Sequence, residues 1–169
     1  DASDDVSLPE VESIGDYAFM NCTSLESIEM PQTLKDVGSY SFRDSGIYDK
    51  ALTGVVYADN WLVDYNENLI SDVKVHPGTV GIARYAFYNC TGLTDVLIGK
   101  GVTEIDDYAF GYCSNLKTVT IYNAVERIGC DSFSNCSKLT DVYYFGTDAE
   151  WNAIEKGSLA YGIILRKTG

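Results

Sequence analysis

The stretch YAFYNCTGLTDVLI, from Tyr85 to Ile98, has close copies in YAFMNCTSLESIEM (Tyr17 to Met30) and YAFGYCSNLKTVTI (Tyr108 to Ile121). A fixed period of this size is typical of a solenoid, in which each repeat forms one coil and needs a neighbour to bury its apolar face. We therefore predict a mostly β solenoid with parallel strands and short helical turns. The Phe of each AF or SF pair marks the repeats, at intervals of 23, 45, 23 and 23 residues: Phe19, Phe42, Phe87, Phe110 and Phe133.

Each repeat ends in an apolar pattern, L-x-x-V-x-I, which matches the core of leucine-rich repeats. In the copy with Leu116, Val119 and Ile121, apolar and polar residues alternate, and this alternation predicts a strand with one face buried. The same pattern predicts strands at Leu25/Ile28/Met30, Leu93/Val96/Ile98 and Leu139/Val142/Tyr144. Apolar residues earlier in each repeat indicate a second, shorter row of strands: Ile14, Val37, Ile82, Ile105 and Ile128.

The interval of 45 residues contains a coil that departs from the repeat. Its strand is still present, because ISDVKVHP (residues 70–77) aligns with LESIEMPQ (residues 25–32). Its AF…C half is replaced by VVYADNWLVDY (residues 55–65), two β-rich runs around Asp59 and Asn60 that predict a β-hairpin. We expect a hairpin-decorated coil over residues 48–77 that exposes some of Tyr57, Trp61 and Tyr65.

The C-terminal segment, residues 146–169, is predicted to cap the solenoid. Thr147 and Glu150 fit a capping box and Gly157 fits a helix stop, so a short helix is expected near residues 148–156. Trp151 and Ile154 can then cover the last coil, and residues 162–166 can add a final strand. These assignments describe residues 1–169 as one solenoid domain.

Composition and motifs restrict the function. With 12 Lys and Arg against 25 Asp and Glu, the net charge of −13 argues against nucleic acid as a partner. No apolar run reaches the roughly 18 residues of a membrane span, and the acidic N-terminus is unlike a signal peptide. The single histidine, His76, has no nucleophile motif beside it, and no cofactor or metal motif occurs. We expect a monomer without catalytic residues, metal or cofactor.

Four cysteines occupy the same position of the repeat, which Ser45 takes in the second copy. We interpret them as a stack of buried thiols that pack as small apolar groups. Neighbouring coils would be close enough that distance alone does not exclude a disulfide. Cys130 lies outside the shared position, whose members are Cys22, Cys90, Cys113 and Cys136.

Three segments carry a family resemblance: IGDYAFMNCTSLESIEMP, GVVYADNWLVDY and VYYFGTDAEWNAI. Together they resemble the BspA-like leucine-rich repeat proteins of bacterial cell surfaces. The resemblance implies an exported protein, surface-displayed or secreted, and an association with adhesion, including binding of host proteins such as fibronectin and fibrinogen. No ligand-binding residues are shared across that family, so it implies a class of function and no particular site.

A sheet of stacked strands offers a platform that suits a protein or an extended polymer. We therefore predict a non-enzymatic module for adhesion or protein recognition, with a protein or a glycan as partner. The alternative is a structural spacer or accessory module of a larger extracellular protein, for example one that degrades polysaccharides. Because aromatic residues are enriched at interfaces, two candidate contact patches follow, one on the strands (Thr118, Thr120, Tyr122, Tyr143 and Phe145) and one on the hairpin (Tyr57 and Trp61).

Overall fold

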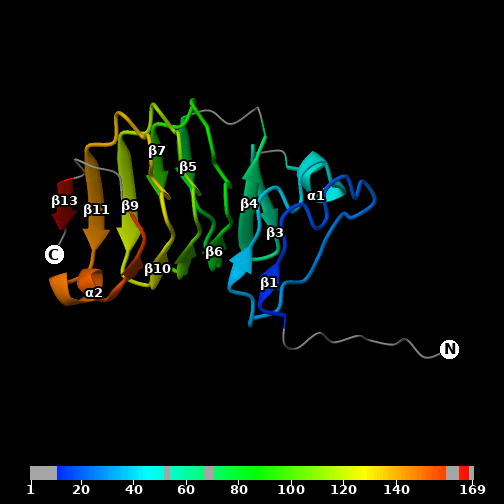
Figure 1. Cartoon of the computed structure of the whole chain (residues 1–169), viewed down its shortest axis with the longest axis horizontal. Helices are drawn as coiled ribbons and strands as arrows, with labels where there is room; N and C mark the ends of the chain where they lie inside the picture. Colours follow the sequence, from blue (N-terminus) through cyan, green and yellow to red (C-terminus); the bar gives the residue numbers. More distant parts are fainter. Residues whose placement is uncertain (1–10, 52–53, 67–70, 159–163, 168–169) are drawn as a thin grey trace.

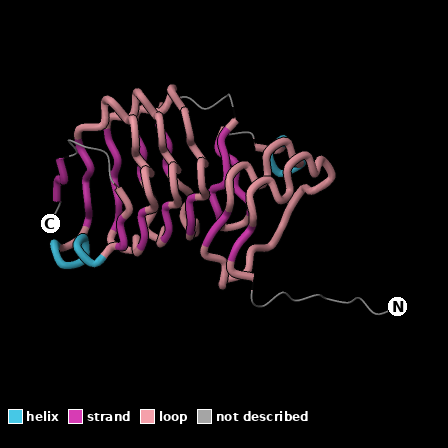
Figure 2. Tube along the Cα trace, in the orientation of Figure 1, coloured by secondary structure: helices cyan, strands magenta, loops and turns pink. Residues whose placement is uncertain are grey.

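The computed structural model describes residues 11–51, 54–66, 71–158 and 164–167. It shows a β-solenoid whose coils stack along the long axis of the molecule, with the described strands running from β1 at one end to β13 at the other (Figure 1). The predicted fold class is therefore confirmed. Most of the other described residues form turns, and helix is confined there to two short segments (Figure 2).

Five parallel strands, one from each successive coil, form the main sheet. The register repeats the sequence period, so that Val73, Val96, Val119 and Val142 lie side by side in one buried row. In order across the sheet the strands are β5 (Asp72–Lys74), β7 (Asp95–Leu97), β9 (Thr118–Tyr122), β11 (Asp141–Phe145) and β13 (Ile164–Lys167).

The predicted second row of short strands is also present. It forms a six-stranded sheet, β3 (Val55–Ala58), β4 (Trp61–Tyr65), β6 (Gly81–Ile82), β8 (Glu104–Ile105), β10 (Arg127–Ile128) and β12 (Glu155–Lys156). A separate pair is formed by β1 (Ser13–Ile14) and β2 (Asp36–Val37). All pairs are parallel except that of β3 with β4, which is the predicted hairpin.

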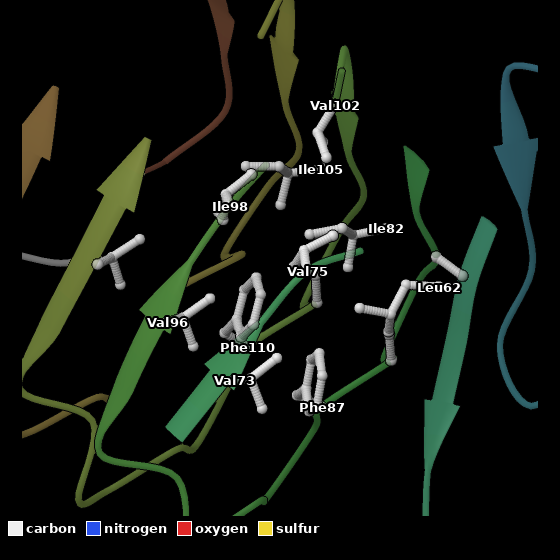
Figure 3. Packing of buried hydrophobic residues seen from close by; sticks show 14 of the residues in the cluster. Leu62, Val73, Val75, Ile82, Phe87, Val96, Ile98, Val102, Ile105 and Phe110 are labelled. Carbon is white, nitrogen blue, oxygen red and sulfur yellow. The ribbon is translucent and has the colours of Figure 1, made fainter. Parts of the chain in front are cut away.

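The core lies between the two rows of strands, and stacked phenylalanine rings occupy its centre (Figure 3). The centroids of Phe87 and Phe110 are 5.2 Å apart and those of Phe110 and Phe133 are 5.3 Å apart, with ring planes within 9°. Tyr65 extends the stack on the other side, 5.9 Å from Phe87. The hairpin coil, which lacks the AF pair, thus supplies its own ring at the shared position from the end of β4.

One predicted strand is absent. Residues 25–30 form no strand, although their pattern matches that of the later repeats. In the next coil the helix α1 (Gly46–Asp49) lies beside residues 22–25, and none of the described strands pairs with residues 25–30. Ser45, at the position of the shared cysteine, is the N-cap of α1, and its hydroxyl accepts a hydrogen bond from the Tyr48 backbone N–H.

The C-terminal cap is present but its helix is shorter than predicted. Helix α2 (Asp148–Ala153) begins with the expected capping box of Thr147 and Glu150. It ends well before Gly157, because Glu155 and Lys156 pair with β10 as strand β12. Trp151 packs edge-on against Tyr144 at 5.1 Å, which confirms that the cap covers the last coil. Of the predicted strand 162–166, residues 162 and 163 lie outside the described part of the chain.

Candidate functional site

The strand patch predicted from the sequence comes together on the outer side of the main sheet. We call Thr118, Thr120, Tyr122, Tyr143 and Phe145 the sheet face. They alternate with buried residues along β9 and β11, and the register pairs Thr120 with Tyr143 and Tyr122 with Phe145. The rings of Tyr122 and Phe145 stack with centroids 4.9 Å apart, and Phe145 is 39% exposed.

Charged groups border this face. The Lys100 Nζ lies 5.3 Å from the centroid of the Tyr122 ring, within the range of a cation–π contact. Arg166, the neighbour of Tyr143 across the sheet, forms an ion pair with Asp141. Its hydrogen bond to Asp141 lowers the pKa of that carboxyl group. The sheet face therefore combines exposed aromatic surface with groups of both charges at its edge.

The predicted hairpin patch is wrong for Trp61, which is buried with only 1% of its surface exposed. Its ring lies against Gly81 of the next strand, where an added Cβ would be 2.4 Å from the indole. Tyr57 is half-buried, stacks on the exposed His76 at 4.2 Å, and its hydroxyl accepts a hydrogen bond from the His76 backbone N–H. The hairpin lies against the solenoid because its apolar residues complete the core of the missing coil.

The shared cysteine position forms a column of free thiols only over the last three repeats. Cys90, Cys113 and Cys136 are buried, and the Sγ of Cys113 and Cys136 each donate to a phenylalanine carbonyl of the preceding coil at 3.1 Å. The hydrogen bond with Cys136 and burial raise the pKa of Cys113. Cys22 is exposed, so the prediction of a buried thiol there is wrong. It lies in the first described coil, where residues 15–18 and 21–24 are all exposed and a described coil packs on one side alone.

Two buried carboxylates are paired with arginines. Asp64 is 2% exposed with its Oδ2 3.6 Å from an Arg43 nitrogen, and burial raises its pKa to about 6. Asp106 is fully buried and contacts Arg127. Both pairs lie where coils meet, which fits a structural role for them. Within the described ranges, no group of three His, Cys, Asp or Glu side chains is placed to hold a metal ion.

The structure also assembles a surface that sequence reasoning missed. Six tyrosines from four coils lie together along one edge, and we call them the tyrosine surface: Tyr17, Tyr40, Tyr85, Tyr88, Tyr108 and Tyr112. The sequence signal for four of them was the Tyr one residue before Ala or Ser, which recurs in four of the five repeats that carry the core Phe.

These features define the class of protein: a leucine-rich-repeat solenoid with one open sheet face and no described helix long and apolar enough to cross a membrane. The sequence matches the BspA type leucine-rich repeat region in six copies, over residues 3–58 and 64–161. The chain belongs to the BspA-type leucine-rich repeat family. No curated protein sequence matches it.

Solved structures share the fold. The pneumococcal vaccine antigen PcpA is 17% identical with a TM-score of 0.56, over 95% of this chain and 49% of that one. The leucine-rich repeat protein TpLRR of T. pallidum is 21% identical with a TM-score of 0.43, over 92% of this chain and 66% of its own. A leucine-rich cell surface protein of Faecalibacterium prausnitzii is 23% identical with a TM-score of 0.37, over 88% and 55%. This chain thus spans half to two thirds of the length of these proteins.

Proposed function

We propose that this solenoid is a surface-displayed or secreted module that binds a partner protein through the sheet face, and that its role is adhesion. Family membership supports a role in protein binding, because leucine-rich repeats of this type are protein-interaction modules and generally not enzymes. The observation that carries the choice of surface is the stacked pair of Tyr122, which is half-buried, and Phe145, which is exposed. A stacked aromatic pair with one exposed ring, held at the ends of two paired strands, is the kind of group that is enriched at the energetic centres of protein interfaces.

The sheet face suits a protein partner in its composition. Thr120 and Tyr143 form the next outward-facing pair along the strands from Tyr122 and Phe145, with Thr118 further along β9, so a partner can form hydrogen bonds beside the aromatic pair. The face is preorganised, since all of its residues belong to β9 or β11, and each of these strands pairs with a strand on both sides. A preorganised surface loses little conformational entropy when a partner binds.

The test is a binding assay with the immobilised segment against fibronectin, fibrinogen and a panel of plant and mucin glycans. We expect retention of at least one protein with a Kd in the micromolar range, and at least about tenfold weaker binding by the double variant Tyr122→Ser/Phe145→Ser. The matched control is Tyr17→Ser, which removes an exposed aromatic ring, 54% exposed, from a different edge.

Two outcomes would contradict the proposal. If no protein of the panel is retained, a spacer or accessory role in a larger extracellular protein becomes the better account. If the double variant binds as well as the parent while Tyr17→Ser does not, the contact surface lies elsewhere. Retention of a glycan alone would favour the accessory role.

A further inference from the structure

The tyrosine surface is built on a continuous row of four rings. The centroids of Tyr17 and Tyr40 are 5.9 Å apart, those of Tyr40 and Tyr85 are 6.1 Å apart, and those of Tyr85 and Tyr108 are 5.1 Å apart. The row crosses the position of the irregular hairpin coil without a break. Tyr88 packs edge-on against both Tyr85 and Tyr108 and so widens the row.

The backbone does not require tyrosine at these positions. All four residues of the row have left-handed φ angles between 53° and 61°, a conformation that bulky side chains rarely adopt. The next coil has Asp131 at the same position with a φ of 54°, and the other left-handed position of each repeat holds Asn or Asp in four of five cases. Asn and Asp tolerate this conformation best. Tyrosine is therefore kept in the row against the local backbone preference.

The row lines a groove of about 480 Å³, whose walls include the carboxylates of Asp16 and Asp107. The Oδ1 of Asp16 accepts a hydrogen bond from the Ser39 backbone N–H, and the Oδ1 of Asp107 accepts one from the Cys130 backbone N–H, each at 2.7 Å. Among the residues that the structure describes, the second oxygen of each accepts no hydrogen bond. The groove thus presents phenol rings together with carboxylate oxygens that are available to a donor.

The charge around the groove is negative. Arg84, the one cation in its lining, is 3.2 Å from Asp36, and Arg43 beside the row is paired with Asp64. The Oδ1 of Asp107 is 4.0 Å from an Arg127 nitrogen. Asp16 forms no ion pair among the described residues, so the groove keeps an excess of carboxylate in a protein whose net charge is −13. Arg43 also shows how a cation meets this surface, since its guanidinium carbon lies 5.3 Å from the centroid of the Tyr40 ring.

We propose that the tyrosine surface is a second binding site, which docks an extended segment of a partner protein rich in Arg or Lys. Alternate side chains of an extended peptide recur about every 6.6 Å, close to the interval between the rings of the row. Basic side chains on one face of such a segment can contact successive rings and reach Asp16 and Asp107. The complementary charge speeds association and selects basic over acidic partners. Tyrosine also offers a large amphipathic contact area with few rotamers to restrict.

The experiment measures fluorescence anisotropy of a labelled octapeptide of alternating Arg and Gly, at physiological salt. We expect saturable binding that is at least about tenfold weaker in the double variant Tyr85→Asn/Tyr108→Asn. Asn suits the left-handed backbone and leaves the net charge unchanged, so loss of binding reports on the rings. The thermal midpoint of the variant verifies that it folds. The matched control, Tyr122→Asn/Tyr143→Asn, removes two tyrosines from the sheet face and should bind the peptide as the parent does.

Four results would overturn the proposal. They are no binding of the peptide, equal affinity of the parent and the Tyr85/Tyr108 variant, equal binding of a Glu-Gly octapeptide, and tighter tyrosine-dependent binding of the oligosaccharide cellohexaose. Equal affinity would mean attraction by net charge alone. The sheet-face variants test the proposed function separately, so the failure of either idea leaves the other standing.

Discussion

The stack of rings in the core predicts a large and position-dependent loss of stability when one ring is removed. Phe110 is 0% exposed and lies between Phe87 and Phe133 at 5.2 and 5.3 Å. Truncating a buried Phe to Ala costs about 3–5 kcal/mol, and the loss of two stacking partners places Phe110→Ala in the upper part of that range. Phe19 occupies the same position in the first described coil, but it is only partly buried and stacks on Phe42 alone. We expect Phe19→Ala to cost about 1–2 kcal/mol.

The assay is equilibrium unfolding in urea followed by circular dichroism, with the midpoint and slope fitted for the parent and both variants. Because a loss of 4–5 kcal/mol is a large part of the stability of a typical domain, Phe110→Leu serves as a milder substitution, with an expected cost of roughly 1–2 kcal/mol. A loss below about 1 kcal/mol for Phe110→Ala, or one no larger than that of Phe19→Ala, would refute the inward stacking as the main source of stability.

Three further predictions concern charged and capping groups. Because Asp64 has a pKa of about 6, the folded chain holds a proton between pH 4 and 6 that the unfolded chain releases, so stability falls as the pH rises. The stability of Asp64→Asn relative to the parent should therefore increase by about 2 kcal/mol between pH 4 and 7 in urea unfolding, and a constant difference would contradict the burial of this charge. Arg127→Ala leaves the buried Asp106 without its cation and should cost about 3–5 kcal/mol, most of it recovered when Asp106→Asn is added. Thr147→Ala removes the capping box of α2 and should cost about 1 kcal/mol in thermal unfolding, and an unchanged midpoint would show that the box adds nothing.

Periodicity predicted most of the fold because each regular coil repeats both its sequence and its neighbours. The rows of Val96, Val119 and Val142 and of Ile82, Ile105 and Ile128 lie where their 23-residue spacing places them. The capping box was equally local, since Thr147 and Glu150 contact each other within one helical turn. In each case the information lies within a single repeat or within a few residues.

Predictions failed where the outcome depended on a neighbouring coil. Residues 25–30 have the strand pattern, but they form no strand, and no described strand of the next coil pairs with them. Cys22 matches the buried cysteines in sequence and is exposed because its coil, the first described one, is covered by a described coil on one side alone. Helix α2 stops at Ala153 because β10 offers a free edge to Glu155 and Lys156. Trp61 is buried because Gly81 on the adjacent strand leaves room for its ring.

The sequence by itself determined the repeating coil, its apolar interior and the cap, because side-chain period and capping chemistry act over a few residues. Only the tertiary structure decided that Tyr65 fills the position of the missing Phe, since that position is set by the ring of Phe87 in space and not by a residue count. It also decided that tyrosines from successive coils meet in one row across the irregular coil, so that Tyr40 and Tyr85, 45 positions apart in the chain, become neighbours. The stacking of coils brings together residues that are distant in the sequence, and both surfaces proposed to bind partners are formed in this way.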